Sequence, residues 1–176
     1  VPTPGGGLCC DPVFTRSGAY DQRWVEQRQD VLVYSTPPLE EAIEVTGPIK
    51  VSLFAMTSAA DTDFTAKLVD VDPSGYARNL TDGIIRARYR NSRIKAELLN
   101  QGDIIEYEID LWATSNLFQK DHLIRLEISS SNFPRFDRNL NTDADIGKDS
   151  KFVQALQTVY HTRKYPSHIL LPIIPR

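Results

Sequence analysis

Alternation of apolar and polar residues with a period of two is the feature that most restricts what this chain can fold into. It is clearest from Ile105 to Leu111, where Glu106, Glu108 and Asp110 separate apolar residues. This period is typical of a β-strand with one buried face and one solvated face. No segment keeps the helical period over three turns. The sequence therefore predicts an all-β protein.

Turn residues divide the alternating segments into short strands. We expect about nine strands, spaced as in β-sandwiches and barrels. A parallel sheet would need crossover helices, for which the chain has no suitable segment, so antiparallel pairing is favoured. The architecture we predict is a two-sheet β-sandwich of jelly-roll type.

Individual segments allow sharper predictions. Residues 64–71 carry bulk on both faces, which is typical of a strand inside a sheet. Pro73, Ser74 and Gly75 predict a hairpin turn after it. Arginine recurs at every second position of 85–90, and acidic residues recur likewise in 105–111. Opposite charges on facing strands contribute roughly 0.2 to 1 kcal/mol a pair, so we take the pairing of Arg88 with Glu108 as a hypothesis.

Length and composition limit the class of protein. The chain has 176 residues, of which 41% are hydrophobic and 24% charged, which suits one folded domain. The net charge of −3 and the absence of a Lys/Arg cluster argue against a nucleic-acid partner, and no apolar run is long enough to span a membrane. We expect residues 1–30 to be a linker and an irregular segment packed on the domain, and residues 31–176 to form the sandwich.

The N-terminal residues give weaker indications. Val1 to Gly7 has neither the basic start nor the apolar core of a signal peptide, and the missing initiator Met suggests a processed chain or a fragment. Cys9 and Cys10 are neighbours, which disfavours an ordinary disulfide between them. We expect reduced thiols and a cytoplasmic protein.

No catalytic triad emerges from the residues of this chain. The G-x-S-x-G pattern that places a hydrolase serine on a sharp turn is absent. Without a recognisable nucleophile, structural roles are the simplest interpretation of the three histidines, His122, His161 and His168.

Metal and cofactor sites are not expected either. Four oxygen-bearing side chains resemble a calcium loop in spacing: Asn141, Asp143, Asp145 and Asp149. However, Ile146 replaces the loop glycine and Phe152 replaces the bidentate glutamate, so we interpret the segment as a solvated acidic loop. Two further acidic pairs are interpreted as turn formers, Asp61 with Asp63 and Asp70 with Asp72.

Carbohydrate binding is the alternative function for a free-standing jelly roll. Such a site would use exposed aromatic rings, for which Trp24 and Trp112 are available. Trp112 directly follows the apolar strand that ends at Leu111, so we expect it to be buried.

The segment from Leu123 to Thr142 combines a strand with a dense group of functional side chains. After the alternating strand come aromatic, charged and amide residues in the sequence NFPRFDRN, residues 132–139. Sheet proteins place contact surfaces on such segments at strand ends. The segment is therefore either a self-contained structured loop or a contact surface.

Several long motifs together resemble one known family. They are DTDFTAKLVDV (61–71), LTDGIIRARYR (80–90), YEIDLWATSNLF (107–118), HLIRLEISSSNFPRFDRNLNT (122–142) and QTVYHTRKYPSHILLPIIP (157–175). In this order they resemble the C-terminal domain of the X-prolyl dipeptidyl peptidase and cocaine esterase family. The resemblance implies a galactose-binding-like jelly roll that follows an α/β-hydrolase domain in the same polypeptide.

The resemblance also implies where catalysis occurs. Members of the family are serine hydrolases that cleave esters or X-proline and other amide bonds, and their triad lies in the hydrolase domain. We therefore expect this chain to be non-catalytic, to pack on that domain and to help form its acyl or peptide pocket. A homo-oligomer is the other partner we consider.

The same resemblance suggests which residues would face the hydrolase domain. We expect them in the loop after the strand at Leu123 and in the turn before residue 64. The candidates are Asn132, Phe133, Arg135, Phe136, Asp137, Arg138, Asp63 and Phe64.

Overall fold

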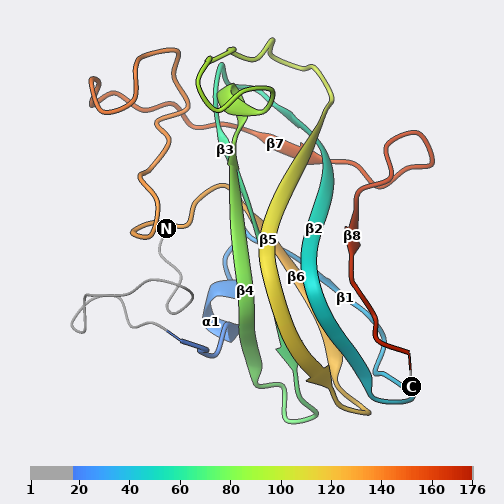
Figure 1. Ribbon diagram of the computed structural model, residues 1–176. Helices are drawn as coiled ribbons and strands as arrows, with labels where there is room; N and C mark the ends of the chain where they lie inside the picture. The colour runs from blue at the N-terminus through green and yellow to red at the C-terminus, as the bar shows by residue number, and fades with distance from the viewer. Residues whose placement is uncertain (1–17, 176) are drawn as a thin grey trace.

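The computed structural model describes residues 18–175 of the protein. The predictions for the N-terminal linker, the signal peptide and the two cysteines therefore lie outside the described residues. Within them, one short helix, one 3-10 helix and eight strands follow each other along the chain (Figure 1). They are α1 (Arg23–Glu26), β1 (Leu32–Ser35), β2 (Ile43–Thr57), β3 (Asp63–Val71), β4 (Ala77–Arg86), the 3-10 helix Ala87–Tyr89, β5 (Ile105–Phe118), β6 (Leu123–Ser129), β7 (Gln157–Val159) and β8 (His168–Leu170).

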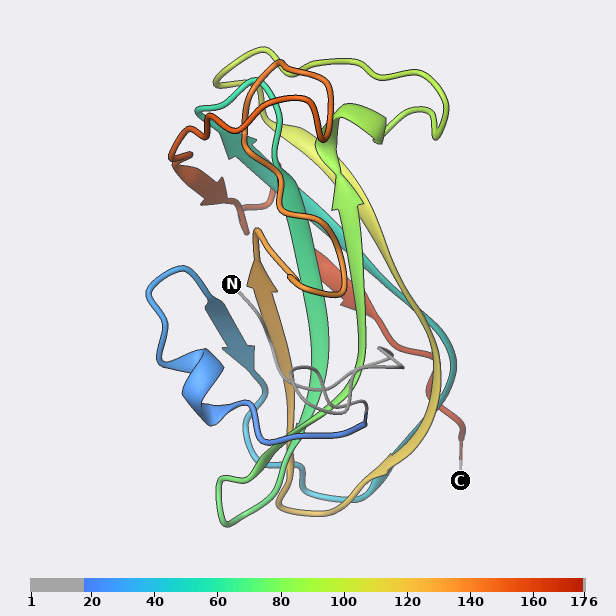
Figure 2. The ribbon, with the colours of Figure 1, turned by 90° about the vertical axis from the view of Figure 1, so that its left-hand side faces the viewer.

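The strands form two antiparallel sheets. One sheet has the order β1-β6-β3-β4, and the other has the order β5-β2-β7 with β8 also paired to β2. The views in Figures 1 and 2 show the two layers, with α1 and β1 beside β6. The prediction of an all-β, two-sheet sandwich is confirmed.

Two strands continue past residues that usually end a strand. Residues 43–45 and 49–55 belong to one strand, β2, because Gly47 and Pro48 continue the ladder with β5 and only shift its register. Gly47 has φ +135°, a conformation that suits glycine, and a Cβ there would lie 3.0 Å from Pro172. Residues 77–86 likewise form one strand, β4, so turn residues inside a strand did not end it.

The apolar faces of both sheets form one core. Tyr107, Ile109 and Leu111 of β5 point inward, as the alternation predicted, and the ring of Tyr107 packs on Phe64 with 4.8 Å between ring centroids. Every residue of β3 is buried, because β3 lies between β6 and β4. The prediction of an internal strand over 64–71 is confirmed, as is the hairpin turn between β3 and β4.

The pairing of the two oppositely charged segments was predicted wrongly. β4 pairs with β3, and β5 pairs with β2, where Glu108 accepts a hydrogen bond from Lys50 Nζ at 2.8 Å. Arg88 lies beyond β4 in the 3-10 helix and binds Asp61 instead. β4 and β5 are in different sheets, and they approach each other so closely that a Cβ on Gly83 would lie 2.1 Å from the carbonyl oxygen of Asp110.

Trp112 is exposed, contrary to the prediction that it is buried. The register between β2 and β5 shifts at Ile49, which faces both Leu111 and Trp112. Such a bulge places two consecutive residues of one strand opposite one residue of its partner. Leu111 therefore remains in the core, whereas Trp112 turns outward at φ +65° and is 69% exposed.

The last part of the chain has little regular structure. Within residues 152–161, pairing is limited to β7 and an isolated bridge between His161 and Pro166; within 167–174 it is limited to β8 and an isolated bridge between Ile173 and Val45. β8 pairs with β2 alone, an edge position that suits the flanking prolines, Pro166 and Pro172. Before β1, the predicted irregular segment includes the single helical turn α1, whose Val25 is buried.

Candidate functional site

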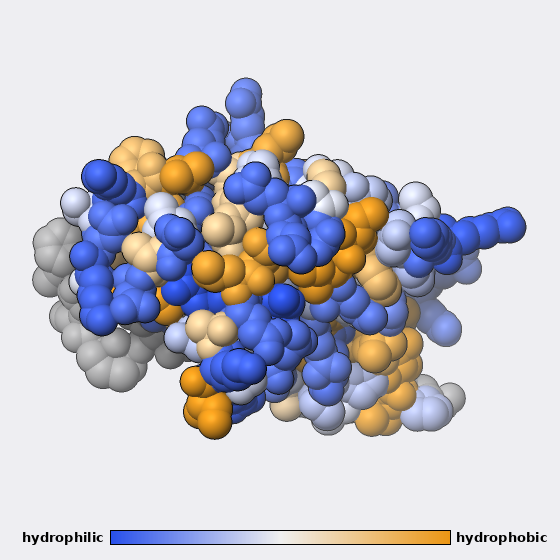
Figure 3. All heavy atoms as spheres, turned by 90° about the horizontal axis from the view of Figure 1, so that it is seen from above, coloured by the Kyte–Doolittle hydropathy of each residue, from blue (hydrophilic) through white to orange (hydrophobic). Residues whose placement is uncertain are grey.

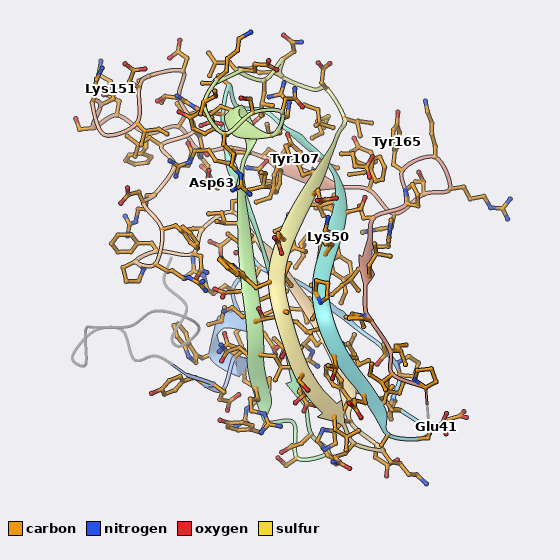
Figure 4. The ribbon with its side chains drawn as sticks, viewed as in Figure 1. Glu41, Lys50, Asp63, Tyr107, Lys151 and Tyr165 are labelled. Atoms are coloured by element: carbon orange, nitrogen blue, oxygen red, sulfur yellow. The ribbon has the colours of Figure 1, made fainter. Side chains whose placement is uncertain are left out.

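The candidate site is the loop of residues 130–156, which joins β6 to β7 across one end of the sandwich. Figure 4 shows Asp63 at this end, near the 3-10 helix, and Glu41 at the opposite end. A set of ion pairs and amide contacts fixes the loop to the ends of β3 and β4. We call it the Asp–Arg network; its members are Asp61, Asp63, Asp82, Arg86, Arg88, Asn132, Arg135 and Asn139.

The first ion pair joins adjacent strands. Arg86 of β4 donates from Nε and Nη2 to the two oxygens of Asp63 at 2.9 Å each. Burial raises the pKa of Asp63 above its usual range, although the hydrogen bonds from Arg86 and Asn139 act in the opposite direction. The hydrogen bond to Asp63 raises the pKa of Arg86. The planar guanidinium matches the carboxylate, so this pair fixes the end of the sheet.

The second ion pair reaches from the sandwich into the loop. Asp61 accepts the backbone N–H of Arg88 at 2.9 Å and its Nε at 2.7 Å. The two remaining nitrogens of the guanidinium donate to the carbonyl oxygens of Ala144 at 2.9 Å and Thr142 at 2.8 Å. Both side chains are buried. Arg88 therefore uses all three guanidinium nitrogens to tie the loop to η1, the 3-10 helix Ala87–Tyr89.

Amide groups connect these pairs to the loop. Asn139 Nδ2 donates to Asp61 and to Asp63, at 2.8 Å each. Arg86 Nη2 also donates to the carbonyl oxygen of Asp137 at 3.1 Å. Buried charges are stable only when they are paired and hydrogen-bonded. The network meets this requirement by using loop residues as partners, so the loop conformation is coupled to the strand ends.

The third carboxylate holds the start of the loop. Asp82 of β4 accepts a hydrogen bond from Asn132 Nδ2 at 2.5 Å and forms an ion pair with Arg135. Asn132 and Asp82 are buried. These contacts orient the turn that contains Phe133 and Phe136.

The outer side of the loop carries the remaining candidates. Phe133 is 37% exposed, and the guanidinium of Arg138 lies over its ring, 4.8 Å from the centroid. Arg135 lies over Phe136 at 5.3 Å. Arg138 has no carboxylate partner among residues 18–175, in contrast to the arginines of the network. The loop thus presents an aromatic ring and an unpaired cation on a rigid base.

The predicted site residues therefore divide into groups. Asn132, Arg135 and Asp63 are internal members of the network, and Asp137 contributes its backbone oxygen. Phe133 and Arg138 lie at the surface. Phe64 is buried in the core against Tyr107, although one side of it reaches the floor of an adjacent groove.

Five network members are not among the site residues predicted from the sequence: Asp61, Asp82, Arg86, Arg88 and Asn139. The turn-forming role expected for Asp61 and Asp63 is wrong, because both bind arginine, whereas Asp72 does form its turn by accepting the N–H groups of Ser74 and Tyr76. The sequence does contain a pattern that indicates these ion pairs. The pattern Asp-x-Asp at 61–63 and the pattern Arg-x-Arg at 86–88 have the same spacing, as adjacent antiparallel segments require.

A groove of about 670 Å³ lies beside the loop. Residues 28–32 line it on the β1 side, and residues 129–131, 138–139 and 152–157 together with Asn141 line it on the loop side. Its exposed apolar side chains include Phe152 at 78% and Leu156 at 73%. Seen from above, hydrophobic atoms form several separate groups between hydrophilic side chains (Figure 3).

The histidines and acidic loop residues have structural contacts. His122 Nδ1 lies 2.8 Å from Asp70, the ring of His161 packs edge-on against Tyr34, and His168 Nδ1 lies 2.7 Å from the carbonyl oxygen of Pro166. Within the described part of the chain, no group of three His, Cys, Asp or Glu residues could hold a metal ion. None of the helices found between residues 18 and 175 has the length and apolar character to cross a membrane.

Comparison with known proteins identifies the domain. Residues 10–170 match the family described as X-Pro dipeptidyl-peptidase C-terminal non-catalytic domain. The chain belongs to this family. It is 48% identical over 180 residues to the cocaine esterase of Rhodococcus sp. (strain MB1 Bresler), a match that covers 100% of this chain and 31% of the esterase.

Solved structures agree with this assignment. An aminopeptidase from the marine sediment archaeon Thaumarchaeota archaeon matches with TM-score 0.84 and 36% identity, over 89% of this chain and 28% of that chain. An α-amino acid ester hydrolase matches with TM-score 0.84 and 33% identity, over 89% and 27%. The chain thus spans less than a third of the length of each of these relatives.

Proposed function

We propose that this domain belongs to a serine hydrolase and packs on its α/β-hydrolase domain, where it helps to form the acyl or peptide pocket. The observation that carries the proposal is the match of residues 10–170 to a non-catalytic domain family; the relatives named above include an esterase and an aminopeptidase, each about three times longer than this chain. The reaction would be cleavage of an ester or X-proline amide bond by residues outside this chain.

The Asp–Arg network supports the proposed role of the loop. A surface that positions a pocket in another domain must keep its geometry without that domain, because interfaces that are already ordered lose less conformational entropy on docking. The network supplies this rigidity from Asp61, Asp63 and Asp82, while Phe133 and Arg138 remain available for contact. Aromatic and arginine side chains are the ones that most often dominate interface energies.

An esterase assay tests whether catalysis depends on residues outside this chain. The 176-residue chain is expected to show no turnover of p-nitrophenyl esters above buffer, because its histidines contact Asp70, Tyr34 and Pro166 rather than a nucleophile. The longer polypeptide encoded by the same gene is expected to hydrolyse esters or X-proline amides and to lose activity with a serine-directed inhibitor. Inhibitor-sensitive turnover by the 176-residue chain would contradict the proposal.

A second assay tests the contact surface within the longer polypeptide. Phe133→Ala is expected to lower kcat/KM by about tenfold, equivalent to about 1.4 kcal/mol, since it removes an exposed ring from a docking surface. Ile94→Ala serves as the control, because Ile94 is 97% exposed and lies outside the loop. Equal effects of both substitutions would argue against a role of the loop at the pocket.

A further inference from the structure

The groove beside the loop adjoins the start of an edge strand, because Leu32 is the residue of β1 that lines it. β1 is the outermost strand of its sheet and pairs only with β6 along Leu32–Ser35. Its other edge has no strand partner within residues 18–175, and the side chains of Leu32 and Val33 are exposed. Exposed apolar edge strands promote pairing with another chain segment, and natural proteins normally cover or blunt them.

The opposite wall is also open but well fixed. Val153 N–H donates to the carbonyl oxygen of Leu140 at 2.9 Å, and the Leu156 N–H donates to Ser58 Oγ at 2.9 Å. These contacts hold the backbone of 152–156 in place, while Phe152 and Leu156 project outward. Gln157 Oε1 is buried at this wall and has no hydrogen-bond partner among the described residues.

Charge distinguishes the two ends of the groove. Arg28 on the β1 side is neutralised by Asp30, with Nη2 and Oδ2 2.6 Å apart. Arg138 on the loop side has only the ring of Phe133 as its partner in the described chain. A guanidinium over an aromatic ring retains its hydrogen-bond donors for a planar anion such as a carboxylate.

We propose that this groove receives an extended segment of the polypeptide outside residues 1–176, which lies along β1 and places an acidic side chain on Arg138. The inference rests on the proposed function, because it assigns the groove to the part of the protein that this chain lacks. That part is large enough: the chain covers only 31% of the esterase relative and 28% of the aminopeptidase relative. Backbone pairing to a sheet edge, with pockets for alternate side chains, is a known mode of segment recognition.

Cross-linking of the longer polypeptide tests the occupant. The photoreactive analogue p-benzoylphenylalanine is placed at Phe152, whose exposure makes the change tolerable, and at Phe133, with Ile94 as a position away from the groove. Position 152 is expected to cross-link to a peptide outside residues 1–176 that contains Asp or Glu. Cross-links from 152 only to residues 1–176, or to a second copy in a mixture of heavy and light isotope-labelled protein, would overturn the inference.

The same experiment separates this inference from the proposed function. Cross-links from position 133 to the hydrolase region, without any from position 152, would leave the proposed function standing and refute the groove assignment. The absence of cross-links to that region from both positions would refute both.

A charge substitution tests the role of Arg138. In the longer polypeptide, Arg138→Glu is expected to speed amide exchange of residues 31–35 about tenfold, because repulsion would weaken docking of the segment. Arg138→Lys should keep most of the protection of residues 31–35 from amide exchange. Arg93→Glu, at an exposed position outside the groove, should leave this protection unchanged. In the 176-residue chain, Arg138→Glu should not alter this exchange; equal effects in both proteins would show a role in the sandwich alone.

Discussion

At the scale of single residues, burial alters the contacts and the pKa of charged side chains in this domain. Beneath α1, Lys67 Nζ donates to Gln22 Oε1 at 2.7 Å and lies 3.8 Å from Glu127, while Arg125 forms an ion pair with Glu26 at 2.7 Å. One oxygen of Glu26 and one of Glu127 are buried without a hydrogen-bond partner among the described residues. Burial is the main factor that raises the pKa of Glu127 to about 7, and the nearby carboxyl of Glu26 adds to it.

The raised pKa predicts a pH-dependent stability. Folding favours protonated Glu127, so its contribution is complete below the unfolded pKa of 4.5 and is lost as the pH rises to about 7. The free energy of unfolding should fall across this range, at up to about 1.4 kcal/mol per pH unit. Glu127→Gln should remove that fall, since a neutral amide needs no proton.

Urea unfolding from pH 4.5 to 8 measures this effect. The difference in unfolding free energy between the unsubstituted protein and Glu127→Gln reports on Glu127 itself. The neighbouring charged groups are the same in both proteins; they are Lys67, Glu26, Arg125 and Asp82. Parallel stability curves for the two proteins would contradict the prediction. Glu41→Gln, at the far end of the molecule, is the control for removing one carboxylate.

At the scale of elements, ion pairs connect a long loop to strand ends. Loops without regular structure are usually short, yet residues 130–156 form a long loop with a defined conformation. Arg88 explains part of this order because it joins Asp61 to the carbonyl oxygens of Thr142 and Ala144. The loop therefore depends on a residue about fifty positions earlier in the chain.

Removal of this connection should be costly. Arg88→Ala leaves Asp61 buried without its cation, and breaking a buried ion pair typically costs about 3 to 5 kcal/mol. Chemical denaturation should show this loss, and proteolysis should cut residues 140–150 faster. Arg93→Ala, which removes an exposed arginine, should change stability by less than about 0.5 kcal/mol. A loss below 1 kcal/mol for Arg88→Ala would show that the pair contributes little.

At the scale of the whole molecule, one glycine sets how closely the two sheets approach. Gly83 of β4 faces the backbone of Asp110 in β5, and Thr81 Oγ1 donates a hydrogen bond to the carbonyl oxygen of Leu111 nearby. These contacts close the sandwich along the β4 and β5 side. On the opposite side of the molecule, the ring of Tyr34 in β1 packs against His161, and the groove lies beside the start of β1.

A methyl group at Gly83 should therefore separate the sheets. Gly83→Ala would place Cβ 2.1 Å from the carbonyl oxygen of Asp110, and backbone cannot move aside as a flexible side chain can. We expect a loss of about 3 kcal/mol or more in unfolding free energy, as for strong overpacking. Gly147→Ala is the matched control: it meets no atom within 4 Å and should cost only the strain of its positive φ, about 1 to 2 kcal/mol. Equal losses of unfolding free energy for the two substitutions would contradict the role of Gly83 in the close approach of the sheets.

The sequence by itself determined the all-β class, the internal position of 64–71, the hairpin turn after it and the inward face of 105–111. Each depends on local alternation or on turn chemistry, which neighbouring residues express without the rest of the fold. The family resemblance added the non-catalytic role, and the match of residues 10–170 confirmed it.

Only the tertiary structure decided which segments meet. Charge patterns suggested that Arg88 faces Glu108, but the core packing assigned β4 and β5 to different sheets, so each charge found another partner. Trp112 became exposed because a bulge opposite Ile49 interrupts the alternation that predicted its burial. The Asp–Arg network arises in the same way. Alternation determines on which face of a strand each side chain lies. Which residue it contacts there depends on pairing between segments that are distant in the chain.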